Sequence, residues 1–275
     1  MGGGGSIKLE GSTFYFSSER AWYNIREFTD NPQIIVMIRD PVQRAFSSYI
    51  HLFKRDKPLD LRSFDQIVST ISRRSEKGKP LELTEDEVLR NAIQDELISA
   101  DHFGKGYLRE RLDVSFDSNF EDPLWPYRYF AESQYSKKIN KIRNVFDKST
   151  VKIVVFERLI NSPNRVINEV FKFLNLNIES EKILSLPHKN ETTLPRGQLA
   201  RSLMRLRKQM AVVDRVWRYL EVHAEPIVRC IRSITKKPKP TLSKETYNSA
   251  RVLLKNEYEY WAQHKTFTNS FWRRH

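Results

Sequence analysis

The sequence predicts an α/β fold in which a mostly parallel sheet is flanked by helices. Two short apolar runs rich in β-branched residues, QIIVMI at residues 33–38 and TVKIVVF at residues 150–156, are each bounded by polar turns. Such runs are typical of strands buried on both faces. Helical patterns lie before and after each run, and an order of strand, helix, strand, helix favours parallel strands joined by crossover helices.

Local signals predict where most helices begin and end. A helix over about residues 18–29 has Ser17 or Ser18 as its N-cap, and the next helix has Asp40 as N-cap, Pro41 at its first position and an end near residue 54. A helix over about residues 133–146 precedes the second strand. NSPNRVINEVFKFLNL after that strand repeats the capped, proline-started design, whereas residues 56–122 indicate an insertion of helices and loops.

The chain is predicted to have three parts. Residues 1–6 form a flexible Gly-rich start, residues 7–195 form the α/β core, and residues 196–275 form a basic helical C-terminal part of the same domain. Apolar residues recur at steps of four and three from Leu199 to Leu220, and a last helix is predicted over about Lys244–Gln263.

Composition narrows the class of protein. The chain has no run of 18 or more apolar residues and no basic-then-apolar start, and its single cysteine, Cys230, can form neither an internal disulfide nor a metal site. We therefore expect a soluble protein of the reducing cytoplasm, without a transmembrane segment or a metal.

The net charge of +13 is concentrated at one end of the chain. From Arg196 onward there are 18 Lys and Arg against 6 Asp and Glu, compared with 29 against 28 before it. This basic part is either a solvated helical surface or a surface for an anionic partner such as a nucleotide, an acidic polysaccharide, a lipid headgroup or a nucleic acid. A nucleic-acid role would rest on charge alone, because no aromatic platform or known motif accompanies it.

The most specific motif is RDPVQRAFSSY, which follows the first predicted strand directly and runs into a helix. Ligands of open α/β sheets bind at this end of a strand, and a helix N-terminus offers amides and a partial positive charge to an anion. Arg39 adds a bidentate donor and Ser47 a hydroxyl on the same helix. Arg44 is predicted to be a surface or salt-bridging residue that steadies the turn rather than a ligand contact, and His51 to be an ordinary helix residue.

A strand followed by RDPxxRxxSxY resembles the 3′-phosphate-binding segment of sulfotransferases that use 3′-phosphoadenosine-5′-phosphosulfate (PAPS), in particular the bacterial and carbohydrate (heparan-type) branch. The resemblance implies a P-loop-NTPase-like fold, with Arg39 and Ser47 binding the 3′-phosphate of PAPS or of its product PAP. It also implies transfer of a sulfuryl group to a hydroxyl or amine, with a carbohydrate as the first choice of acceptor and a lipid or small metabolite as the second.

Three further stretches are similar to that family: LEGSTFYFSS at residues 9–18, the region from residue 133 to 176, and HKNETTLPRGQLAR at residues 188–201. By this resemblance Arg196 closes over the nucleotide, and Gly197 allows close backbone approach. Glu10 either positions the substrate or a base, or makes a structural hydrogen bond. Heparan-type enzymes often carry a lysine where this chain has Gly11.

The family's phosphosulfate-binding loop, similar to PKSGTT, and its catalytic base normally precede the segment around Glu10. Only MGGGGSIK stands there in this chain. We therefore expect an N-terminally truncated domain without the first strand and that loop, an unassigned base, and little sulfotransfer by this chain alone. The alternative is a non-catalytic sulfotransferase-like protein that binds PAP or an anionic polymer. Arg201, Arg205 and Lys208 are the candidate surface for an acidic polysaccharide.

Overall fold

The structure is a computed structural model of the whole chain, and its description covers part of the sequence. Described are residues 8–12, 15–53, 59–98, 124–176, 194–195, 236–237, 241–264 and 272. The flexible start, the helix predicted from Leu199, and the predicted site residues Arg196, Gly197, Arg201, Arg205 and Lys208 lie outside the described residues. The division into a core and a basic C-terminal part therefore stays a prediction.

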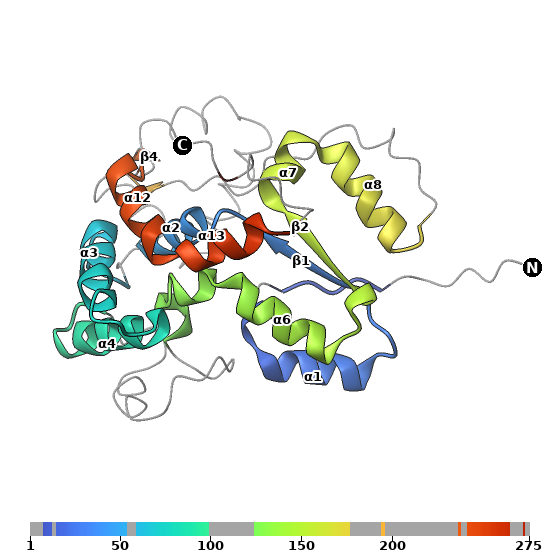
Figure 1. Cartoon of the computed structure of the whole chain (residues 1–275), viewed down its shortest axis with the longest axis horizontal. Helices are drawn as coiled ribbons and strands as arrows, with labels where there is room; N and C mark the ends of the chain where they lie inside the picture. Colours follow the sequence, from blue (N-terminus) through green and yellow to red (C-terminus); the bar gives the residue numbers. More distant parts are fainter. Residues whose placement is uncertain are drawn as a thin grey trace, which may run out of the picture.

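The two predicted strands form a parallel pair at the centre of the molecule (Figure 1). Strand β1 (Ile34–Ile38) pairs in register with β2 (Val151–Val155), and this confirms the predicted parallel arrangement. A separate short antiparallel pair joins β3 (Leu194–Pro195) to β4 (Lys236–Lys237).

The prediction that both strands are buried on both faces is wrong for β1. Val36 and Ile38 are buried, but Ile35 is 40% exposed and Met37 is 52% exposed. Side chains alternate between the two faces of a strand, so one face of β1 reaches the core while the other stays partly open. The helix α8 (Pro163–Phe173) packs against β2, where Val151, Val154 and Val155 are all buried.

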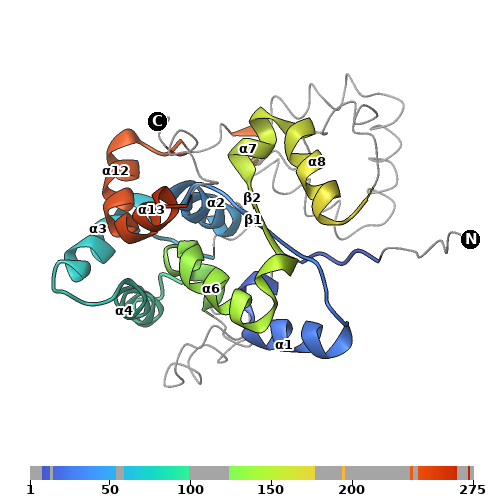
Figure 2. The ribbon, with the colours of Figure 1, turned by 45° about the vertical axis from the view of Figure 1, so that its right-hand side comes forward.

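Helices lie on both sides of the strand pair (Figures 1 and 2). Helices α1 (Glu19–Phe28) and α6 (Tyr135–Val145) lie together on one side, and α7 (Phe156–Asn161) and α8 lie on the other. Because α1 leads into β1 and α6 leads into β2, both helices run back along the strands. Their N-termini therefore lie at the carboxyl edge of the sheet (Figure 1).

The predicted helix starts are mostly confirmed. Ser18 caps α1 by accepting the Ala21 amide at 3.2 Å, and Asp40 caps α2 (Pro41–Phe53) by accepting the Gln43 amide at 2.8 Å. The α8 helix begins at a proline as predicted, but Ser162 before it makes no side-chain capping bond. Ser162 also ends α7, and its φ of −147° and ψ of 61° depart from the extended geometry typical of an N-cap.

The remaining helices extend the core away from the sheet. The predicted insertion contains α3 (Phe64–Ser75) and α4 (Leu81–Gln94), and four short 3₁₀ turns are described: η1 (Tyr15–Ser17), η3 (Trp125–Tyr127), η4 (Ala131–Ser133) and η5 (Lys148–Thr150). In the described ranges, no helix has both the length and the apolar character needed to cross a membrane.

The single helix predicted at the end of the chain is in fact two helices, α12 (Lys244–Leu253) and α13 (Lys255–Ala262). They meet at Leu254, which is buried at 1% exposure and has a non-helical backbone conformation (φ −104°, ψ 18°). Periodicity continues through this break, so the sequence pattern does not reveal it.

The carboxylate of Asp40 joins the start of α2 to the two C-terminal helices, α12 and α13. It is buried, and besides capping α2 it accepts the hydroxyls of Tyr247 at 2.9 Å and Tyr258 at 2.8 Å. Burial, together with the nearby Asp40 carboxylate, raises the pKa of Tyr247 to about 12. The Asp40 backbone amide donates to Glu157 at 2.8 Å, which ties the end of β1 to the end of β2.

We expect Asp40→Ala to lower the free energy of unfolding by about 3 kcal/mol, because it removes a helix cap and leaves two buried hydroxyls without their acceptor. Urea unfolding followed by circular dichroism measures this loss. Ser18→Ala is the matched control, because it removes a cap alone and should cost about 1 kcal/mol. Equal losses in the two variants would contradict the role given to Asp40.

Candidate functional site

Arg39 lies at the carboxyl edge of the sheet, directly after β1. Its guanidinium carbon is 5.4 Å from the centre of the Phe156 ring, and Phe156 is the first residue after β2. The Nε atom of Arg39 is buried and has no hydrogen-bond partner among the described residues. A buried guanidinium N–H without an acceptor is costly, and an anion supplies the acceptor that it lacks. The side chain therefore fits a phosphate ligand.

The backbone at the start of α2 contributes less to an anion site than the sequence predicts. The Gln43 amide already donates to Asp40, and the Asp40 amide already donates to Glu157. These two N–H groups are occupied by carboxylates, so an anion bound here depends chiefly on side chains. The difference from the prediction arises because Asp40, the residue that caps the helix, accepts the Gln43 amide and donates its own amide to Glu157. Neither amide is then available to an anion.

Ser47 is exposed on α2, about 9 Å along the helix axis from Pro41 at 1.5 Å per residue. Its side chain is therefore accessible to solvent. Arg39 directly follows β1 and Ser47 lies two turns into α2, so both belong to one continuous segment, and their joint binding of a phosphate stays a prediction.

Glu10 is exposed and accepts the hydroxyl of Tyr15 at 3.1 Å. This bond and the Glu10 charge raise the pKa of Tyr15. This contact is a structural hydrogen bond, which is one of the two roles that the sequence allows for Glu10. A Cβ at Gly11 would meet no atom within 4 Å, so the first carbon of a side chain there would not clash.

Of the two structural roles predicted for Arg44, the structure shows the salt bridge, and it connects α2 with η4. The guanidinium lies 3.9 Å from Glu132 and donates to the carbonyl of Tyr129 at 3.3 Å. Arg44 lies between Arg39 and Ser47 in the chain, so the same segment that carries the candidate phosphate ligands also contacts η4.

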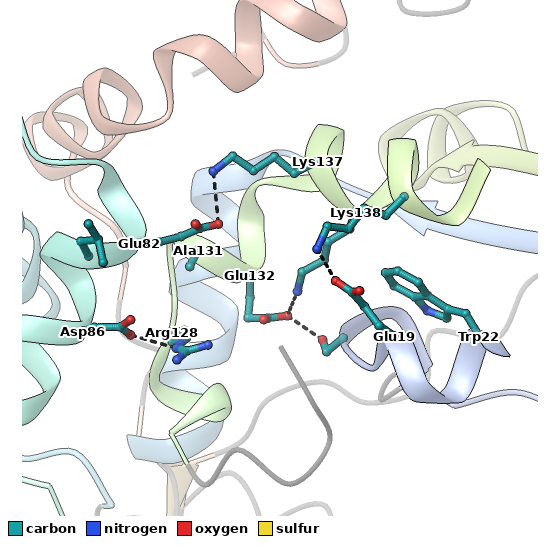
Figure 3. Close-up of a pocket in the computed structure, with 12 residues that line it drawn as sticks. Glu19, Trp22, Glu82, Asp86, Arg128, Ala131, Glu132, Lys137 and Lys138 are labelled. Atoms are coloured by element: carbon teal, nitrogen blue, oxygen red, sulfur yellow. Dashed lines mark hydrogen bonds and ion pairs between the residues drawn. The ribbon is translucent and has the colours of Figure 1, made fainter. Parts of the chain in front are cut away.

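A cavity of about 390 Å³ opens beside η4, between the starts of α1, α4 and α6 (Figure 3). Its charged residues form four ion pairs, each between two different segments of the chain: Glu19–Lys141, Glu82–Lys137, Asp86–Arg128 and Glu132–Lys138. No motif in the sequence predicts this cavity. Its only local signal is the spacing of Lys137, Lys138 and Lys141, which is also typical of a solvated helix face.

Glu132 is the most buried carboxylate of the cavity, at 3% exposure. It accepts the hydroxyl of Ser17 and the ammonium of Lys138, each at 2.5 Å. Burial raises its pKa, but the charges of Lys138 and Arg44 together with these hydrogen bonds more than offset burial and leave the pKa below its usual value. Glu132 is therefore ionised at neutral pH.

The sequence was compared with models of known protein families. Residues 22–192, well over half of the chain, match the family model of the sulfotransferase domain. The chain belongs to the sulfotransferase family. The matched range contains Arg39, Ser47, both strands of the parallel pair and almost all of the charged cavity, whereas Glu10 and Arg196 lie outside it. No curated protein matches the chain.

Family membership assigns the general chemistry, which is transfer of a sulfuryl group to an acceptor. In this sulfotransferase Arg39 stands at the edge of the sheet where ligands of open α/β folds bind. The charged cavity opens at the starts of α1 and α6, which lie at the same edge.

Glu85 supports the turn that carries Glu132. It is buried at 1% exposure and accepts the backbone amides of Phe130 at 3.0 Å and Ala131 at 2.7 Å. Burial raises its pKa to about 7, against the lowering effect of these two bonds. The proton equilibrium of Glu85 is therefore linked to the conformation of η4.

We expect the free energy of unfolding to fall by up to about 3 kcal/mol between pH 4.5 and pH 7.5 because of Glu85. Its folded pKa is raised, so the folded state holds the proton more tightly; the stabilisation is complete below pH 4.5 and is lost as the pH passes about 7. Urea unfolding across this range measures the slope. Glu85→Gln should flatten it, and an unchanged slope in that variant would contradict the assignment.

Proposed function

We propose that this sulfotransferase uses PAPS as donor, on a P-loop-NTPase-like sheet, and transfers the sulfuryl group to a hydroxyl or amine of a carbohydrate. The observation that carries the proposal is Arg39, whose buried Nε lacks an acceptor among the described residues at the carboxyl edge. A nucleotide phosphate provides that acceptor. We also propose a cytoplasmic location.

In this proposal Arg39 and Ser47 hold the 3′-phosphate of the nucleotide, and Arg196 closes over it with Gly197 allowing close approach. Asp40 and Glu157 fix the backbone beside Arg39 through the 2.8 Å bond between them. The Arg39 guanidinium lies over the face of the Phe156 ring, and this cation–π contact helps to hold it in position. Positioning of this kind lowers the barrier to group transfer because the reacting groups meet in one geometry.

PAPS supplies the sulfuryl group: a bond forms from the acceptor oxygen or nitrogen to sulfur, the bond from sulfur to the phosphate oxygen breaks, and the acceptor proton passes to a base. Fixed donors and cations beside the 5′-phosphate would stabilise the negative charge that PAP carries away, whereas Arg39 would hold the nucleotide by its 3′-phosphate. The base is unassigned, and Glu10 is the candidate that the sequence offers. Its carboxylate is exposed at the surface beside Tyr15.

We expect PAP to bind, and Arg39→Ala to weaken binding by about 30-fold or more, because a charge-assisted bidentate contact is lost. Ser47→Ala should cost about fivefold, the worth of one neutral hydrogen bond. Isothermal titration calorimetry measures both. Arg26→Ala, which removes an exposed arginine near the far end of α1, is the control. Equal PAP affinity of wild type and Arg39→Ala would remove the site assignment.

A second prediction concerns the basic C-terminal part. If Arg201, Arg205 and Lys208 form a surface for an acidic polysaccharide, reversing the three charges should abolish retention on a heparin column, and retention of the wild type should fall steeply with salt. Reversal of three cations in α8 and η5 makes the same change in net charge and serves as the control: Lys148, Arg165 and Lys172. Unchanged elution of the first variant would leave the basic part as a solvated surface.

A further inference from the structure

The charged cavity lies at the edge of the sheet where the nucleotide is proposed to bind. It is bordered by the first turns of α1 and α6, and both helices start at the carboxyl edge because they lead back into β1 and β2 (Figures 1 and 3). Small-molecule substrates of open α/β folds bind in concave sites at this edge. The cavity volume of about 390 Å³ falls within the usual range of such sites.

Arg44 connects the cavity with the proposed phosphate site. It belongs to α2 between Arg39 and Ser47, and its guanidinium lies 3.9 Å from Glu132, which lines the cavity. The same guanidinium donates to the Tyr129 carbonyl, just before η4. The two sites are therefore built on one connected set of segments.

The charges of the cavity indicate the class of ligand. Four carboxylates face four cations in ion pairs, so the lining is strongly polar but has no net charge. Carboxylates accept hydroxyl protons and ammonium or guanidinium groups donate to hydroxyl oxygens, so an uncharged molecule with many hydroxyls can engage both members of each pair. A highly anionic polymer would meet as much repulsion as attraction.

Exposure changes from the mouth of the cavity to its floor. The side chains of Glu82 and Lys137 are 50% and 58% exposed, whereas those of Glu132 and Lys138 are 4% and 13% exposed. The indole of Trp22 adds an apolar surface that is held in place by its 2.5 Å bond to the Tyr15 carbonyl. The cavity therefore has accessible polar groups at its mouth and rigid ones deeper in.

From these observations we propose that the cavity is the acceptor site and that it takes an uncharged carbohydrate through its hydroxyl groups. This inference rests on the proposed function, because it assigns the acceptor of the same reaction. This site is distinct from the proposed polysaccharide surface at Arg201, Arg205 and Lys208. That surface would bind anionic chains, and none of its residues lines the cavity.

The test uses saturation-transfer NMR on the full chain with neutral tetrasaccharides of N-acetylglucosamine, glucose and galactose, and a sulfated heparin tetrasaccharide for comparison. At least one neutral probe should bind. The double variant Glu82→Gln, Lys137→Gln should weaken its binding about tenfold, because it removes two charged hydrogen-bonding groups from the mouth of the cavity. Both side chains are about half exposed, so the variant should fold.

The control is Lys255→Gln, Glu259→Gln, which removes an exposed ion pair of α13 and should leave neutral-sugar binding unchanged. PAP affinity is measured by calorimetry on every variant. If PAP binds but no neutral probe binds, or if the double variant binds the sugar as well as wild type does, the acceptor site is wrong and the proposed function stands. If a neutral probe binds with the expected loss but PAP does not bind, the sugar site stands and the proposed function fails.

Discussion

The buried carboxylate of Asp40 is the contact on which the arrangement of the site depends. A carboxyl group is costly to bury unless hydrogen-bond partners surround it, and here the Gln43 amide and the hydroxyls of Tyr247 and Tyr258 do so. These donors come from the start of α2 and from both C-terminal helices. The Asp40 amide reaches Glu157 as well, so four segments are held at the point where β1 ends.

Two other buried carboxyl groups accept hydrogen bonds from distant segments in the same way. Glu257 of α13 accepts the amide and hydroxyl of Ser136 at the start of α6, and Glu85 of α4 accepts two amides around η4. Each carboxylate holds the first residues of a turn or helix, so the edge is fixed by side chains from distant parts of the sequence. Arg39 has a buried Nε with no acceptor within the described part of the chain, and Arg62 and Arg143 each have one such nitrogen as well. Arg39 is distinguished by its place directly after β1, at the edge where ligands of open α/β sheets bind, and this place makes it the natural anchor for an anionic ligand.

Much of the fold could be predicted from local pattern. The parallel strands and the starts of α1 and α2 follow from apolar periodicity, N-caps and Pro41, all of which act within a few residues. The open face of β1, the break at Leu254 and the charged cavity could not be predicted, because they depend on contacts between distant residues. Ser17 and Glu132, for example, are 115 residues apart in sequence. For the site, the motif located Arg39 and Ser47 but gave no sign that Asp40 and Glu157 occupy the neighbouring amides, and Arg196 and Gly197 stay predictions.

Recognition of the 3′-phosphate by Arg39 can be measured by comparing the binding of PAP with that of adenosine 5′-phosphate, which lacks that group. Calorimetry of wild type and Arg39→Ala with both nucleotides forms a cycle that isolates the contact between the guanidinium and the 3′-phosphate. We expect wild type to prefer PAP by about 30-fold or more and Arg39→Ala to lose most of this preference. An equal preference for PAP in both proteins would show that another residue reads the 3′-phosphate and would contradict the account.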